Sequence, residues 1–140
     1  MTMPTEPPER IWTKQSIDRL ADRFKLANEP GMQDWAYEVA DPNRIEEFCR
    51  ALNEFRGDPD TQFTLVDIIL QSFEESDVEL NDNETWEALL HYLEQNAELH
   101  AYQIWYWSSF NSELSDAWRI SPFLRAIWKR VHLQNVGSNS

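Results

Sequence analysis

Apolar residues recur at helical spacing along most of this 140-residue chain. Positions three and four apart share one face of an α-helix, so such a stripe predicts a helix with a buried side. The first stripe predicts a helix within residues 11–26, and a short helix is expected over about residues 33–40. The apolar members of the first stripe are Ile17, Leu20, Ala21 and Phe24.

Start and stop signals separate the next stripes. Asp41-Pro42 is typical of a helix N-terminus, because an aspartate caps free backbone N–H groups and proline suits the first turn. Residues 57–59, which read Gly-Asp-Pro, are expected to end that helix. A further helix is predicted over residues 63–76. The stripe of the helix after Asp41-Pro42 comprises Ile45, Phe48, Cys49, Leu52 and Phe55.

The C-terminal half continues in the same way. A polar loop over residues 77–83 is expected to supply the N-cap of a helix that begins near Glu84. Beyond Asn96 the pattern allows this helix to continue or a new one to start, through Phe110 in either case. Ser121-Pro122 predicts a second N-cap followed by proline, opening a helix over residues 123–133.

The chain has no convincing strand. Residues 65–70 could form one by composition, but no second β-like run is present to pair with them. Three glycines in the whole chain also fit a helical protein. We therefore predict an all-α fold, a single compact bundle of about six or seven helices. Residues 1–10 are expected to be a flexible lead, 11–133 a single helical domain, and 134–140 a flexible tail.

Composition supports a folded protein. Hydrophobic residues make up 41% and aromatic residues 13% of the chain, more than a disordered acidic segment contains. The single cysteine excludes an internal disulfide and suits a reducing compartment. The N-terminus lacks the apolar core of a secretory signal, and no apolar run approaches the length of a membrane helix. These features predict a cytoplasmic protein without a membrane segment.

The charge distribution is strongly asymmetric. Residues 57–118 contain 14 acidic side chains and no Lys or Arg, in a chain of net charge −13. This argues against direct binding to nucleic acid or to anionic membranes, which requires basic side chains. It favours a basic protein partner, steered by the electric field of the acidic block. The acidic residues expected to dock that partner are Glu74, Glu75, Asp77, Glu79, Asp82, Glu84, Glu87, Glu94 and Glu98.

No pattern of residues indicates catalysis, a metal site or a cofactor. Residues 77–88 imitate a calcium loop, but Asp82 replaces its glycine and Ala88 its closing glutamate. Cys49 lies on an apolar stripe, where a thiol is inert. His91 is flanked by glutamates at helical spacing, a pattern that would suit a divalent metal or a proton shuttle but is more typical of a solvated helix face. His100 and His132 are expected at the surface or its boundary. The sequence therefore leaves enzymatic activity open and favours a non-catalytic protein.

An aromatic run over residues 102–110 has three interpretations. Its side chains either fill the core or anchor a binding surface, since Tyr and Trp are frequent in both. A ligand pocket around the run is a third interpretation. The aromatic anchors of the binding hypothesis are Tyr102, Trp105, Tyr106 and Trp107.

The favoured function is therefore a non-catalytic acidic protein that docks a basic partner. A toxin-neutralising or immunity-like protein and a nucleic-acid-mimic inhibitor both fit this description. The first alternative is a small-ligand-binding protein or enzyme with a pocket at residues 102–110. The second is a homo-oligomeric structural protein. The main objection to the favoured function is the basic C-terminal helix, which could neutralise the acidic block through Arg119, Arg125, Lys129 and Arg130.

Overall fold

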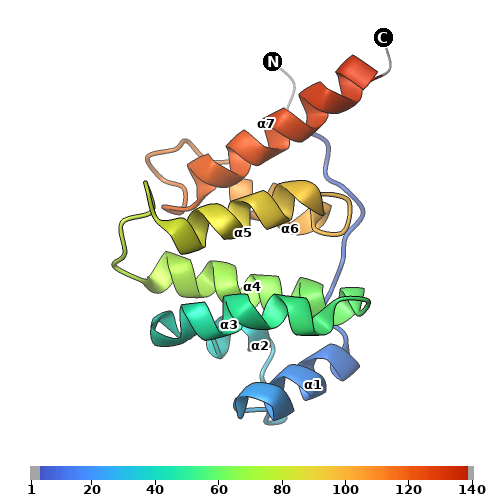
Figure 1. Ribbon diagram of the computed structural model, residues 1–140, viewed down its shortest axis with the longest axis vertical. Helices are drawn as coiled ribbons and strands as arrows, with labels where there is room; N and C mark the ends of the chain where they lie inside the picture. Colours follow the sequence, from blue (N-terminus) through green and yellow to red (C-terminus); the bar gives the residue numbers. More distant parts are fainter. Residues whose placement is uncertain (1–3, 139–140) are drawn as a thin grey trace. The chain divides into compact units, whose positions relative to one another are not determined.

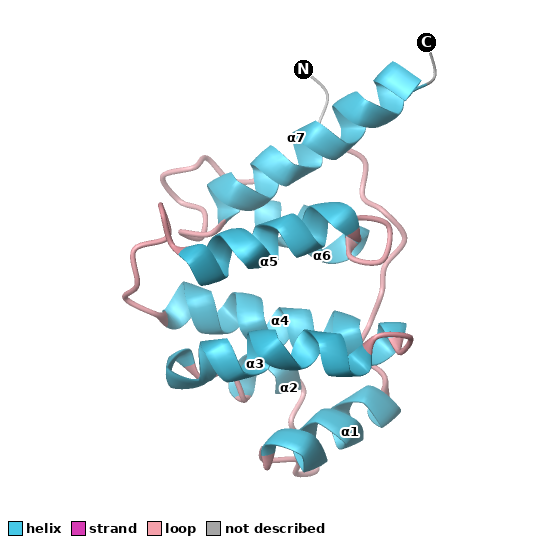
Figure 2. Ribbon diagram, in the orientation of Figure 1, coloured by secondary structure: helices cyan, strands magenta, loops and turns pink. Residues whose placement is uncertain are grey.

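The computed structural model describes residues 4–138, with side chains described from residue 4 to residue 133. This part of the chain is all-α, as predicted, and contains no strand (Figures 1 and 2). The described chain contains seven α-helices and two short 3₁₀-helices, one on each side of the third α-helix. The α-helices are α1 (Lys14–Phe24), α2 (Trp35–Glu38), α3 (Ile45–Ala51), α4 (Pro59–Glu75), α5 (Glu84–Gln95), α6 (Ala101–Ser108) and α7 (Ser121–Ser138); the 3₁₀-helices are η1 (Pro42–Arg44) and η2 (Leu52–Phe55).

Contacts between residues divide the chain into two compact units. Unit 1 comprises residues 4–10 together with 80–138, and unit 2 comprises residues 11–79. The N-terminal segment thus belongs with the C-terminal half of the chain. The expectation of a single domain over residues 11–133 stays a prediction.

Helix α4 is the central helix of unit 2 and contacts α1, α2 and α3. It begins four residues earlier than the predicted start at Phe63, because Asp58-Pro59 is itself a start signal. The Asp58 carboxylate accepts a hydrogen bond from the Thr61 N–H at 3.3 Å, and Pro59 occupies the first turn. The sequence Gly-Asp-Pro therefore ends one helical segment and also opens the next.

Polar side chains inside unit 2 are paired with one another. The Thr13 side chain caps α1, and the hydroxyls of Ser16 and Thr64 lie 2.8 Å apart between α1 and α4. The indole N–H of Trp12 donates to the Asp67 carboxylate at 2.8 Å, so this buried acid has a partner. Asp67, although part of the acidic block, therefore contributes to the interior and not to the surface.

The start signal at Asp41-Pro42 is confirmed, although it first opens a 3₁₀ turn. The Asp41 carboxylate accepts a hydrogen bond from the Asn43 N–H at 2.9 Å, and η1 leads directly into α3. The Asp41 N–H donates to the Ser72 hydroxyl at 2.9 Å, which ties this turn to α4. Local capping and a contact from a distant helix therefore fix the same turn.

Unit 1 is built from α5, α6 and α7, with α7 in contact with both other helices. Asn83 caps α5, accepting from the Trp86 N–H at 2.9 Å, as the polar loop predicted. The helical pattern stops at Gln95 and restarts at Ala101, which decides between the two alternatives. Trp86 and Trp107 are almost fully buried and belong to the core.

The predicted role of Ser121 as an N-cap is wrong. Ser121 is the first residue of α7, and its hydroxyl donates to the Trp107 carbonyl at 2.8 Å. The side chain therefore satisfies a carbonyl at the C-terminal end of α6 instead of capping its own helix. A serine before proline has the same local sequence in both roles, and only the position of α6 separates them.

The two chain ends are described only in part. Residues 4–12 form no helix, and α7 continues to Ser138, five residues beyond the predicted end at Leu133. Residues 1–3 and 139–140, which fall in the predicted lead and tail, lie outside the described residues. Within the described chain, no helix combines the length and the apolar character needed to cross a bilayer.

Candidate functional site

The predicted docking acids are distributed over both units. Glu74 and Glu75 end α4, and Asp77 and Glu79 follow in the loop, all in unit 2. Glu74 is half-buried, whereas the other three are exposed. Of these, Glu75 and Asp77 have no hydrogen bond or ion pair within the described chain. Unit 2 therefore presents carboxylates to solvent at the end of its central helix.

The remaining predicted acids lie in unit 1. Glu84 and Glu87 occupy the first turn of α5, and Asp82 precedes it with a backbone φ of 62°. These three side chains are exposed and have no ion-pair partner in the described structure. Glu98, in the turn after α5, is also exposed and without an ion pair. Unit 1 thus carries exposed carboxylates without ion pairs at the start of α5 and in the turn after it.

Glu94 is the exception among the acids of unit 1. Its carboxylate accepts a hydrogen bond from Arg130 Nε at 2.7 Å, and its side chain is 23% exposed. This ion pair joins α5 to α7 and is the contact that the basic C-terminal helix was expected to make. Glu94 is therefore occupied by the chain itself.

Arg125 does not neutralise the acidic block. Its guanidinium donates to the carbonyls of Ser108, Ser109 and Ser112 at 2.6–2.7 Å. These carbonyls belong to the end of α6 and the turn after it, where helix geometry leaves backbone acceptors without partners. The positive charge of Arg125 serves the fold of unit 1, and Lys129 is exposed at the surface of α7.

The four predicted aromatic anchors differ in exposure. Tyr106 is 37% exposed and Trp107 only 1%, while Tyr102 and Trp105 are half-buried. Trp107 lies 4.8 Å, centroid to centroid, from Trp118 inside unit 1. Trp107 is therefore a core residue, because it occupies the inward face of α6. The tilted or stacked ring contacts of Tyr102 with Trp105 and Tyr106 remain near the surface.

His100 is buried, and its expected place at the surface or boundary is wrong. It is 0% exposed and sits between Tyr92 of α5 and Gln103 of α6. Its Nδ1 lies 2.5 Å from Gln103 Oε1, and its Nε2 lies 2.9 Å from the Tyr92 hydroxyl. Burial, with a smaller contribution from Arg10, lowers the pKa of His100 to about 4. No sequence signal marked this cluster, since its members come from two helices and the turn between them.

The remaining candidates for chemistry are inert or ungrouped. Burial, with a smaller contribution from Glu46, raises the pKa of the Cys49 thiol to about 12, which removes the reactive thiolate at neutral pH. Burial also raises the pKa of Tyr92 to about 12. Among the described residues, no three His, Cys, Asp or Glu side chains are grouped closely enough to hold a metal ion.

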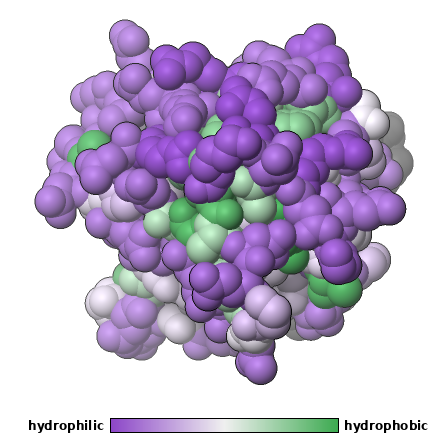
Figure 3. Space-filling model, turned by 90° about the horizontal axis from the view of Figure 1, so that it is seen from below, coloured by the Kyte–Doolittle hydropathy of each residue, from purple (hydrophilic) through white to green (hydrophobic). Residues whose placement is uncertain are grey.

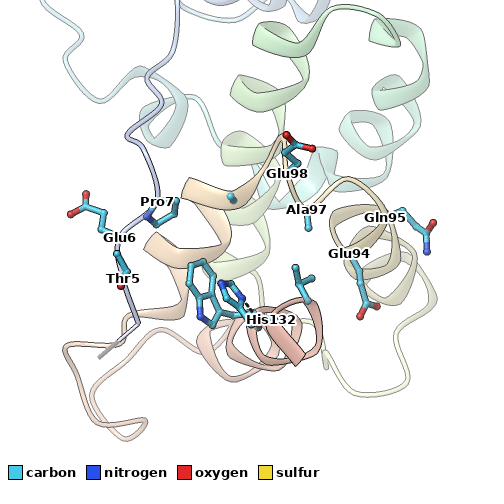
Figure 4. Close-up of a pocket in the computed structure, with 11 residues that line it drawn as sticks. Thr5, Glu6, Pro7, Glu94, Gln95, Ala97, Glu98 and His132 are labelled. Atoms are coloured by element: carbon cyan, nitrogen blue, oxygen red, sulfur yellow. Dashed lines mark hydrogen bonds between the residues drawn. The ribbon is translucent and has the colours of Figure 1, made fainter. Parts of the chain in front are cut away.

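Unit 1 contains a cavity that the sequence did not reveal. Its volume is about 590 Å³, and Figure 4 shows residues 5–7 on one side, Glu94 and Ala97 across from them, and His132 on α7. A second cavity of about 410 Å³ is lined by residues 7–10 and Tyr102. Pro7, Glu98 and Ala101 line both, so the cavities adjoin.

These two cavities meet the aromatic run at one residue. Tyr102 lines the smaller one, and Trp105, Tyr106 and Trp107 line neither. The cavities could not be predicted from local sequence patterns, because they form only where the N-terminal segment packs against the turn between α5 and α6. Comparisons with protein-family models, with curated proteins and with solved structures found no match.

Proposed function

We propose that this protein is a non-catalytic acidic helical protein that docks a basic protein partner. The observation that carries the proposal is the exposure of Asp82, Glu84 and Glu87 without ion pairs in unit 1. Uncompensated carboxylates on one helix produce a field that accelerates association with a cationic surface. Figure 3 shows one face of the molecule, on which hydrophilic residues surround smaller hydrophobic groups.

Two basic side chains of the C-terminal helix have partners other than Asp82, Glu84 and Glu87. In unit 1, Arg130 pairs with Glu94, and Arg125 is held by backbone carbonyls. Neither guanidinium is bound to Glu84, Glu87 or Glu98. The proposed partner is a cationic protein, such as a nuclease toxin or a DNA-binding protein. The proposed complex forms in the cytoplasm.

The experiment is affinity capture with a charge-neutral variant of the acidic surface. The variant Asp82→Asn, Glu84→Gln, Glu87→Gln removes three charges while keeping side-chain size. Asn at position 82 also tolerates the positive φ that Asp82 adopts there. Wild-type protein should retain one basic protein from its host extract and release it at moderate salt. The captured partner should associate with the variant about tenfold more slowly than with the wild-type protein.

A matched control removes the same charge elsewhere. Glu29, Asp34 and Glu46 are exposed acids of unit 2, outside the docking set. Their replacement by Gln, Asn and Gln should leave capture and association rate unchanged. If both variants captured the partner equally poorly, the effect would come from net charge and not from the acidic residues around the start of α5. Retention of the partner by the docking variant at wild-type rate would refute the proposal.

A second candidate function is small-ligand binding, favoured by the cavity of about 590 Å³ in unit 1. This volume lies within the range of ligand pockets. It predicts a change in tryptophan fluorescence on ligand addition, because Trp128 lines the cavity. That response should depend little on salt if the ligand is neutral. A homo-oligomeric structural role stays a third prediction, which sizing at two concentrations would reveal.

A further inference from the structure

The larger cavity combines apolar walls with an acidic rim. Pro7, Ala97 and Val131 contribute aliphatic surface, and Trp128 adds an indole ring. Glu94 and Glu98 also line it. Figure 4 shows the Glu6 side chain turned away from the cavity and Glu98 at its edge. Glu98 therefore places a carboxylate at the edge of a lining that also contains apolar side chains.

The rim already holds one guanidinium in the structure. Arg130 Nε donates to Glu94 Oε1 at 2.7 Å, and both residues belong to unit 1. A charge-assisted bond of this length is typical of arginine–carboxylate recognition. Glu98 has the same chemistry but no such partner, and it is exposed. One carboxylate of the rim is thus occupied by the chain, and another remains available.

The smaller cavity has a different charge. It shares Glu98 with the larger one, but Arg10 lines it as well. A cation placed there would lie beside an existing positive charge. No Lys or Arg lines the larger cavity. In the larger cavity Arg130 occupies Glu94 and the Glu6 side chain turns away, so Glu98 is the carboxylate of the lining that is left for a cationic group.

We propose that this cavity receives an arginine or lysine side chain of the basic partner, its aliphatic stem against Val131 and its charged head at Glu98. Long basic side chains bury their methylene stems while keeping the head near water, which matches apolar walls below an acidic rim. The inference rests on the proposed function, which supplies the basic partner. It adds an anchoring pocket to the long-range attraction of α5.

The test uses the isolated protein and a defined peptide probe. The tripeptide acetyl-Gly-Arg-Gly-amide is titrated into ¹⁵N-labelled full-length protein, and the backbone amides of Ala97, Glu98 and Val131 are followed. These signals should shift saturably. The same peptide with citrulline, an uncharged isostere of arginine, should cause no comparable shift.

Two variants locate the interaction. Glu98→Gln should weaken binding of the arginine peptide about tenfold, the loss expected for one charge-assisted hydrogen bond. Glu113→Gln removes an exposed charge of unit 1 that does not line the cavity, and should change the affinity by less than about twofold. Both variants should keep the wild-type spectrum, because neither side chain has an ion pair in the described structure.

Several results would overturn the inference. They are an absence of shifts at the cavity, equal shifts with the citrulline peptide, or equal weakening in both variants. Binding of a free amine such as agmatine without binding of the peptide would assign the cavity to a small molecule. Because no partner is needed, failure here leaves the capture experiment standing. Failure of partner capture alongside successful peptide titration would reject the proposed function instead.

Discussion

The Tyr92 hydroxyl donates a hydrogen bond to His100 Nε2 at 2.9 Å. The direction follows from the opposite side of the ring, where Nδ1 faces Gln103 Oε1 at 2.5 Å. An amide oxygen can only accept, so Nδ1 carries the proton and Nε2 of the neutral ring is the acceptor. The depressed pKa of this buried ring keeps it neutral at pH 7. The three side chains form a satisfied polar chain inside unit 1.

This arrangement predicts that acid destabilises the fold above the pH at which carboxylates titrate. His100 has a pKa of about 4 when folded and an ordinary value of 6.5. Between these values the unfolded chain binds a proton that the folded chain refuses, so stability falls as pH falls. The free energy of unfolding should drop by about 2 kcal/mol from pH 7 to pH 5. Urea unfolding at the two pH values measures this change.

Titration of the carboxylates affects stability at a lower pH than protonation of His100 does. Hydrogen bonds from basic side chains lower the pKa of Asp18, Glu47 and Glu54 below ordinary values of 3.8 and 4.5. Stability contributed by these groups is lost only at lower pH. His100→Gln should remove most of the slope between pH 7 and pH 5, whereas the exposed His91→Gln should preserve it. An unchanged slope in His100→Gln would contradict the assignment.

Tyr92→Phe should leave His100 Nε2 buried without a donor. Loss of a partner to a buried acceptor costs about 1–3 kcal/mol. The free energy of unfolding at pH 7 should fall by that amount. The substitution should also weaken the pH dependence, because the hydroxyl stabilises the neutral ring and its loss raises the pKa of His100. A variant as stable as the wild type would show that the hydroxyl contributes nothing to the interior.

Trp107 and Trp105 should respond differently to truncation. Trp107 is 1% exposed and contacts other rings inside unit 1, so Trp107→Ala should cost about 3–5 kcal/mol. Trp105 is half-buried, and Trp105→Ala should cost less. Chemical denaturation of both variants measures the difference. If both variants lost little and similar stability, Trp107 would be a surface residue, as the binding hypothesis assumed.

The sequence predicted helices better than it predicted neighbours. Apolar spacing and start signals together located the longer α-helices, and Asp41-Pro42 marked a real start, because both kinds of signal are local. The roles of Ser121 and His100 depend instead on α6, which only the folded chain brings to them. The exposure of Glu84 and Glu87 was predictable, since charged residues opposite an apolar stripe face solvent. The cavity beside the N-terminal segment was not predictable. Apolar spacing describes the face of a single helix and does not show that residues 5–7 pack near Glu94 and Ala97.

Cys49 should be a slow nucleophile in the folded protein. A pKa of about 12, against an ordinary 9.0, lowers the thiolate fraction near neutral pH about a thousandfold. Alkylation by iodoacetamide at pH 8 should therefore be slower by a comparable factor than in urea, where burial is lost. Mass spectrometry over time gives both rates. Rapid modification of the native protein would show that the thiol is neither buried nor inert.

Arg125 should be irreplaceable by lysine. Its planar guanidinium reaches the carbonyls of Ser108, Ser109 and Ser112 together, a geometry that a single ammonium group cannot reproduce. Arg125→Lys keeps the charge and should still lower the free energy of unfolding by about 2 kcal/mol, because hydrogen bonds to partly buried carbonyls are lost.

The comparison with Lys129 separates structure from charge on the same helix. Lys129 is exposed on α7, so Lys129→Gln should alter stability by less than about 0.5 kcal/mol although it removes a positive charge. If charge on α7 stabilised the fold by balancing the acidic block, this ranking would reverse. A stable Arg125→Lys with an unstable Lys129→Gln would then mean that the acidic field is compensated internally, and the docking proposal would lose its support.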